Sequence, residues 1–189
     1  MDKRRLILDA AVRVFAERGY EASRVADVAR EAGVAYGLVY HYFGSKGAVL
    51  EAVFREAWGR LLAAVALAEE SGGDAADQLG LVVRIVFRAW RDDRDLVRVL
   101  VREVTRSPHI QDELDEIGQA FTSLERIVAR GQEAGTFRAT LDPRLCAFMV
   151  YGALEEVLTG WVLGQLPDDA GTVAAAEREV VATIIGGLA

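Results

Sequence analysis

The residues best placed for chemistry lie between Ser23 and Lys46, where two short helical patterns flank a glycine. At about 100° per residue, Tyr36, Gly37, Tyr40 and His41 fall on one side of a helical wheel. Leu38, Val39, Tyr42 and Phe43 fall on the other side and are expected to pack inward. A short helix that presents two hydroxyls and an imidazole around a glycine suits insertion into the DNA major groove.

The elements that position this helix are two turns and a preceding helix. Residues 24–32 form the preceding amphipathic helix, with Ser23 as the expected N-cap. Gly33 follows it, and glycine adopts a left-handed backbone at the lowest cost. The second helix is expected at about 35–42, and Gly44 ends it.

Phosphate contacts are expected at the edges of this unit. Ser45 and Lys46 open a third helix, whose free amides, positive dipole end and lysine can hold a phosphate. Arg24 and Arg30 are further candidates, although each of the three cations is equally compatible with a solvated surface charge. Residues 1–60 carry ten Lys or Arg against eight Asp or Glu, whereas residues 61–189 carry 12 against 21. The first part therefore carries a net charge of +2 and the second part −9, which sum to −7, so the first part remains compatible with DNA.

The first fifty positions resemble the TetR family of one-component transcriptional regulators. The matching residues are Phe15, Gly19, Tyr20, Ser23, Val25, Val28, Ala29, Ala32, Gly33, Val34, Gly37, Tyr40, Tyr42, Phe43, Ser45, Lys46 and Leu50. The chain departs from the family pattern at Ala35, Tyr36, Leu38 and Gly47, which affects the operator sequence rather than the fold. The expected DNA-binding residues are Ser23, Arg24, Ala35, Tyr36, Gly37, Tyr40, His41, Tyr42 and Lys46.

The whole chain is predicted to be all helical, with about nine helices. It has 189 residues, 52% of them hydrophobic, only 3 Pro and no alternating strand-like segments. A first helix carries an apolar stripe from Leu6 to Phe15, and a long helix runs from Lys46 to about Glu70. Later helices are expected at 75–91, 93–106, 109–134, 143–164 and 169–187. The resemblance places a helix-turn-helix domain at 1–46 and a ligand-binding and dimerisation domain at 47–189.

Residues 145–163 are nearly all apolar, which raises the possibility of a membrane span. Glu155 and Glu156 in its middle would each cost about 2.5–3.5 kcal/mol in a bilayer, so a buried helix and no membrane contact are expected. Helices at about 143–164 and 169–187 from two chains would form a four-helix homodimer interface. No export signal is recognised, so the protein is expected in the cytoplasm. The single cysteine, Cys146, is interpreted as a buried thiol.

The second domain carries two sets of residues that could bind a small molecule. Aromatic residues and one methionine could line an apolar cavity, although such residues are more often core: Phe87, Trp90, Phe121, Phe137, Phe148, Met149, Tyr151 and Trp161. An arginine ladder comprises Arg84, Arg88, Arg91, Arg94, Arg98, Arg102 and Arg106. Arginine suits phosphate, but pairing with Glu113, Asp115 and Glu116 is at least as compatible with this pattern.

A second resemblance narrows the effector. Residues 96–166, and 153–164 especially, resemble the ligand domain of TetR-family repressors of fatty-acid degradation, whose inducer is a long-chain acyl-CoA. The resemblance implies an acyl tail in the apolar interior and CoA phosphates on the arginines. The predicted ligand-binding residues are Phe87, Trp90, Arg91, Arg98, Arg102, Phe121, Phe148, Tyr151 and Glu155. A repressor responding to aromatic drugs or another lipophile stays open as an alternative.

The remote alternative is a helical enzyme. An enzyme would need an activated nucleophile, a metal cluster or a positioned acid and base. The only histidines are His41, assigned to the DNA-reading helix, and His109 at a helix start. Glu155 and Glu156 are adjacent and point about 100° apart on a helix. We therefore expect neither catalysis, nor a metal site, nor a cofactor other than the effector.

Overall fold

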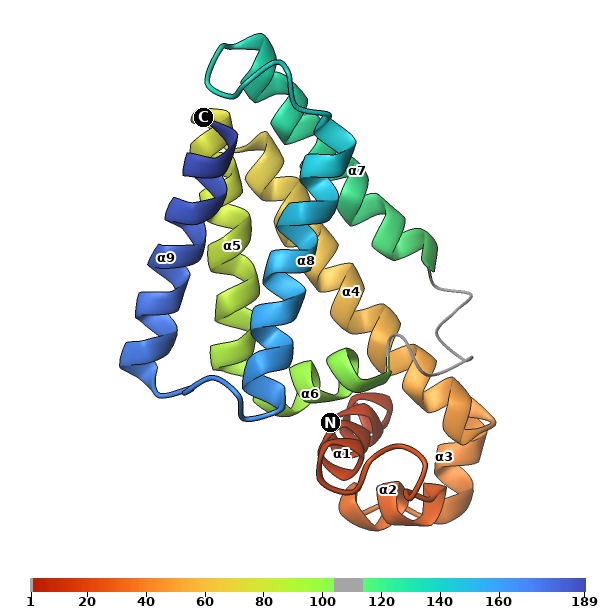
Figure 1. Cartoon of the computed structure of the whole chain (residues 1–189). Helices are drawn as coiled ribbons and strands as arrows, with labels where there is room; N and C mark the ends of the chain where they lie inside the picture. The colour runs from red at the N-terminus through yellow and green to blue at the C-terminus, as the bar shows by residue number, and fades with distance from the viewer. Residues whose placement is uncertain (1, 104–113) are drawn as a thin grey trace. The chain divides into compact units, whose positions relative to one another are not determined.

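The computed structural model describes residues 2–103 and 114–189, except for the side chains of 114–117. Within these residues every regular element is a helix (Figure 1). They are α1 (Lys3–Arg18), α2 (Val25–Glu31), α3 (Tyr36–Phe43), α4 (Lys46–Glu70), α5 (Ala75–Asp92), α6 (Arg94–Glu103), α7 (Leu114–Glu133), α8 (Pro143–Val162) and α9 (Ala170–Leu188). The all-helical prediction is confirmed.

Local sequence signals set most helix ends. The Asp2 carboxylate accepts from the Arg4 amide at 3.0 Å, and Asp142 accepts from the Leu145 amide at 2.8 Å ahead of Pro143. Asp169 accepts from two amides of the first turn of α9. These carboxylates satisfy amides that have no partner inside the helix and lie at the positive end of its dipole.

The chain divides into two compact units, and α4 belongs to both. The first unit comprises α1–α3, α4 as far as Trp58, and α6; the second comprises the rest of α4, α5 and α7–α9. The domain boundary predicted near residue 47 falls in the first turn of α4 and stays a prediction. The second unit therefore lacks α6, which carries part of the arginine ladder.

The first unit is built on the apolar stripe of α1. Ile7, Ala10 and Ala11 are fully buried, and Phe15 packs edge-on against Tyr20 with ring centroids 5.4 Å apart. Helix α1 packs against both α2 and α6. Each large apolar side chain buried here contributes about 1.5–3 kcal/mol of transfer free energy, so the small unit has a true core.

The second unit is organised around α5, α8 and α9, which lie side by side (Figure 1). Phe87 and Trp90 of α5 are completely buried. The Trp161 ring of α8 stacks on Trp90 at 5.6 Å and meets Phe87 edge-on at 4.9 Å. Arg138 in the α7–α8 loop donates its backbone N–H to the Leu188 carbonyl at 2.8 Å, which anchors the end of α9.

One ionic cluster joins α4, α5 and α7 in the second unit. The Glu69 carboxylate, only 11% exposed, accepts two bonds of 2.7 Å from Arg126 and one of 3.1 Å from Arg130. Arg130 also donates to the Gln78 amide oxygen at 2.9 Å. The Arg126 hydrogen bonds, followed by those of Arg130, lower the pKa of Glu69 to about 2.

Helix α8 is the one described helix that is long and apolar enough to span a bilayer by length and composition. Several of its side chains, among them Ala147 and Val150, are buried in the second unit. Leu145, Phe148 and Met149 are 60%, 49% and 65% exposed. Helix α8 therefore has an apolar surface that the described part of this chain leaves open.

The Glu69 cluster predicts an acid-sensitive stability term. Glu69→Gln should lower the free energy of unfolding at pH 7 by about 1–2 kcal/mol, a value reduced from the full pKa shift because both arginines are half exposed. The folded-state pKa is depressed, so this term is present above pH 4.5 and is lost as the pH falls toward 2. Urea denaturation at pH 7 and pH 3 would therefore show a smaller difference between wild type and variant at pH 3. Glu70→Gln, at an exposed neighbour, is the control, and an unchanged difference would contradict the assignment.

Candidate nucleic-acid interface

Lys46 fixes the loop between α1 and α2. Its ammonium donates to the carbonyl oxygens of Tyr20 at 2.8 Å, Ser23 at 3.1 Å and Glu21 at 3.4 Å. The same ammonium lies 4.1 Å from the centre of the Tyr20 ring. Three carbonyls and one aromatic face saturate this cation, so the first turn of α4 is bound to the loop that leads into α2.

The start of α2 differs from the sequence prediction. Arg24, not Ser23, is the N-cap residue, and the Asp27 carboxylate accepts from the Arg24 amide at 3.0 Å. Ser23 is buried, and its hydroxyl donates to the Gly19 carbonyl at 2.6 Å. The hydrogen bond from the Arg24 backbone N–H is the main reason that the pKa of Asp27 is lowered, and Arg30 and Arg18 lower it further. The sequence suggested Ser23 because serine is a common cap, but its hydroxyl closes the preceding loop instead.

A glycine at each end sets the position of α3. Gly33 has a φ of +64°, and the Val34 amide beyond it donates to the Ala29 carbonyl at 3.0 Å, which closes α2. Gly44 has a φ of +79° and donates to the Tyr40 carbonyl at 2.8 Å. Between them, Val39 is the one fully buried residue of α3, at 1% exposure. The helix is therefore held by its ends and one apolar anchor.

The opposite side of α3 is open to solvent. Tyr36 is 53% and Tyr40 42% exposed, and Gly37 and His41 are also exposed. This confirms the prediction that these four residues form the outward-facing arc of α3. The Tyr36 hydroxyl donates to the Tyr40 hydroxyl at 3.0 Å. Tyr42 was predicted on the packing side, but it is 42% exposed and its ring meets His41 edge-on. The wheel was wrong for Tyr42 because it lies in the last turn, where α3 covers little of the core.

The predicted DNA contacts fall into two groups. Arg24, Ala35, Tyr36, Gly37, Tyr40, His41 and Tyr42 are exposed. Ser23 and Lys46 instead bond backbone carbonyls of their own unit. Contact of any of these residues with DNA stays a prediction, and the geometry gives Ser23 and Lys46 a structural role.

The predicted ligand-binding aromatics form two separate clusters in the second unit. Phe87 and Trp90 belong to the buried group around Trp161. Phe121 of α7 stacks on Phe148 of α8 at 4.2 Å and lies 4.7 Å from Tyr151. Burial, with the nearby Glu155 adding to it, raises the pKa of Tyr151 to about 12. Burial also raises the pKa of Glu155, followed by the effect of Glu156.

The arginine ladder is not a single row. Arg91 of α5 pairs with Glu177 of α9 at 2.6 Å, and Arg98 of α6 pairs with Asp95 at 2.9 Å. Arg102 donates to the Ala16 carbonyl of α1 at 3.3 Å. Arg106 and the proposed partner Glu113 lie outside the described residues, as do the side chains of Asp115 and Glu116. The ladder is thus divided between the two units. Its described partners include Asp92 and Asp95, which lie within the ladder itself, and Glu177 and the Ala16 carbonyl, which are distant in sequence.

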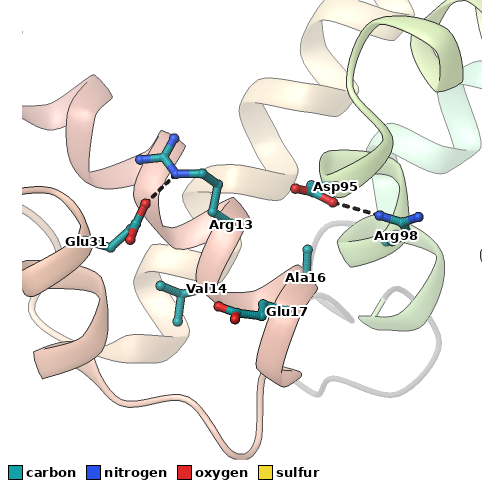
Figure 2. Close-up of a pocket in the computed structure, with 7 residues that line it drawn as sticks. All are labelled: Arg13, Val14, Ala16, Glu17, Glu31, Asp95 and Arg98. Carbon is teal, nitrogen blue, oxygen red and sulfur yellow. Dashed lines mark hydrogen bonds and ion pairs between the residues drawn. The ribbon is translucent and has the colours of Figure 1, made fainter.

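Arg98 lines a pocket of the first unit rather than an apolar cavity. Figure 2 shows the pocket between α1, α2 and α6, with the Arg13–Glu31 pair at 2.6 Å and the Arg98–Asp95 pair beside it. Val14, Ala16 and Glu17 complete the lining. Its charged character suits the packing of α6 on α1 better than a lipid tail.

A short helix pair joined by a glycine turn, with the second helix exposed and held by its ends, defines a helix-turn-helix DNA-binding protein. Two family models match the chain: bacterial regulatory proteins of the tetR family over residues 7–53, and the C-terminal region of YsiA-like protein over residues 54–185. The chain belongs to the TetR family and is a DNA-binding transcriptional regulator.

Similar proteins extend the match over the whole chain. The fatty acid metabolism regulator protein of Bacillus subtilis (strain 168) is 30% identical over 184 residues, covering 96% of this chain and 93% of that protein. The crystal structure of FadR from Bacillus subtilis in complex with stearoyl-CoA superposes with a TM-score of 0.87 at 29% identity, covering 98% of this chain and 99% of that one. The transcriptional repressor KstR2 of Rhodococcus jostii (strain RHA1) is 28% identical, covering 99% of this chain and 91% of that protein.

Salt dependence of DNA binding separates the two roles open to Lys46. Lys46→Met should lower the free energy of unfolding by about 0.5–1.5 kcal/mol, because the part-buried loop carbonyls lose their donor, and should leave the salt slope of operator binding unchanged. Arg24→Met, at an exposed cation, should leave stability unchanged and reduce the slope of log K against log salt by about 0.9 if Arg24 contacts a phosphate. Urea denaturation measures the stability of each variant. Anisotropy titrations between about 50 and 200 mM salt, a range over which such affinities change strongly, measure the salt slope. A reduced slope with unchanged stability in Lys46→Met would contradict the structural role.

Proposed function

We propose that the protein is a homodimeric repressor that leaves its operator when the second unit binds a long-chain acyl-CoA. The family assignment supplies the DNA-binding part of this proposal. The effector and the direction of the response are our inference, as is action in the cytoplasm.

The observation that carries the effector is the likeness to FadR. A protein 29% identical to this chain over almost the full length of both has been crystallised with stearoyl-CoA. The match includes the whole C-terminal region and is not confined to the helix-turn-helix segment, which many regulators share. The comparison therefore favours a fatty acyl thioester over an unrelated metabolite.

The side chains of the second unit also support a lipophilic effector. Phe121, Phe148 and Tyr151 form a stacked aromatic cluster between α7 and α8. Burial raises the pKa of both Tyr151 and Glu155, so the environment around them disfavours charge. Such a setting accepts an acyl chain or a flat apolar ring, and Tyr151 and Glu155 add polar groups that could orient it.

Among the arginines, Arg91 is the predicted ligand contact that belongs to the second unit, where it pairs with Glu177. A coenzyme A phosphate would have to compete with this carboxylate. Arg98 and Arg102 already bond Asp95 and the Ala16 carbonyl, so the first unit uses both of them. We therefore keep Arg91 as the preferred phosphate contact, and Arg98 and Arg102 remain untested predictions.

The effector is tested by fluorescence anisotropy of the protein on DNA from upstream of its own coding sequence. Stearoyl-CoA should release the DNA, whereas stearate and coenzyme A alone should not, because the proposal needs both the acyl tail and the phosphates. Release by stearate as well would remove the arginines from the effector site. Release only by steroids or aromatic drugs would overturn the acyl-CoA proposal and favour the alternative lipophile.

The homodimer is proposed on the apolar surface that α8 leaves open. Leu145, Phe148 and Met149 are exposed there, and α9 lies beside α8 with half-exposed Ile184 and Ile185. Two such helix pairs related by a two-fold axis would form a four-helix interface. A dimer also matches a palindromic operator, whose half-sites lie about 34 Å apart or a multiple of this.

Met149→Glu should convert the dimer into a monomer, because a carboxylate would be buried without a partner. Size-exclusion chromatography with light scattering measures the mass of each species. Leu67→Glu, at a residue of α4 that is 69% exposed, is the matched control and should remain a dimer. A fully dimeric Met149→Glu protein would place the interface elsewhere.

A further inference from the structure

The two exposed tyrosines of α3 form a hydrogen-bonded pair on the arc predicted to face DNA. Tyr36 and Tyr40 are one helical turn apart, their rings are 5.0 Å apart at 56°, and the Tyr36 hydroxyl donates to the Tyr40 hydroxyl at 3.0 Å. Both side chains remain about half exposed. Gly37 between them has open space at its Cβ position, so no side chain there screens the pair.

The bond between the hydroxyls fixes what the pair can offer to a ligand. A phenol has one proton to donate and an oxygen that accepts. Tyr36 uses its proton on Tyr40, so Tyr36 presents only an acceptor and Tyr40 presents a free donor. The same bond raises the pKa of Tyr36, because ionising Tyr36 would remove the proton that it donates to Tyr40. The pair therefore displays one donor beside one acceptor.

We propose that Tyr36 and Tyr40 act together as a bidentate adenine reader in the operator. Adenine presents the N7 acceptor next to the N6 amino donor on its major-groove edge, whereas guanine presents two acceptors, N7 and O6. Tyr40 donates to N7 while the Tyr36 oxygen accepts from N6. Guanine at the same position would require two donors, which the pair supplies only by breaking its own hydrogen bond.

The composition of the arc favours the same base. Arg and Lys are the usual bidentate or strong donors to guanine, and the exposed arc of Tyr36, Gly37, Tyr40 and His41 contains neither. A paired donor and acceptor is also what Asn and Gln use to read adenine. The two phenols thus reproduce that pattern with side chains from successive turns of α3.

The proposal rests on the DNA-binding function of the family and is tested by selection of binding sites from a random DNA library. The wild-type protein should select adenine at one position of each half-site. Tyr36→Phe and Tyr40→Phe should each lose that preference by about tenfold, at the low end of the usual worth of a bidentate contact. The double variant should lose little more than either single variant, because the pair reads one base as a unit.

Tyr42→Phe is the comparison variant, since Tyr42 is equally exposed and is itself a predicted DNA contact but lies outside the pair. Whatever it does to overall affinity, it should leave the adenine preference at the position read by the pair unchanged. Circular dichroism melts of all four variants check that the helix-turn-helix unit stays folded, which is expected because each change removes only an exposed hydroxyl.

Replacing the selected adenine by 7-deazaadenine tests the Tyr40 contact at one atom. This base lacks N7 but keeps the amino group, so it should weaken wild-type binding about tenfold and leave Tyr40→Phe nearly unaffected. Selection of guanine, preferences lost at two different positions, or equal sensitivity of wild type and Tyr40→Phe to 7-deazaadenine would each overturn the proposal.

Discussion

The frame around the recognition helix depends on one cation, the ammonium of Lys46. Lys46 begins α4 and binds the carbonyls of the loop that connects α1 to α2. Without a donor of this length, three backbone carbonyls would have to turn to water, and the loop would lose its link to the helix that follows α3. Lys46, which was predicted from the sequence as a DNA contact, is therefore better explained as the residue that ties the loop before α2 to the helix after α3.

The fold could be predicted from the sequence because its signals are local. Gly33 and Gly44, the Asp142–Pro143 cap and the apolar stripe of α1 act within a few residues, and each marks a helix end or face that the structure confirms. The all-helical class needs no more than this. The resemblance of the first fifty positions then supplied the family, which the two family models confirm.

The details of the site could not be predicted because they depend on residues distant in sequence. The carbonyls that Lys46 binds are more than twenty residues away, and Arg91 meets Glu177 across 86 residues. Spacing shows that arginines share a helix face but not which acid lies opposite. Ser23 has the residue type of a helix cap, yet in the folded unit it is buried and its hydroxyl donates to the Gly19 carbonyl. In each case tertiary packing decides which residue a side chain bonds to, and the periodicity of the sequence does not specify that packing.

The single buried side chain of α3 has an evolutionary consequence. Because Val39 and the two terminal glycines hold the helix, the outward residues contribute almost nothing to the core. Substitutions at Tyr36, Gly37, Tyr40 or His41 can then change which DNA is bound while folding stays intact. A duplicated copy of this gene could acquire a new set of target promoters through a handful of substitutions that do not affect stability, which gives a physical route for one scaffold to diversify into many regulons.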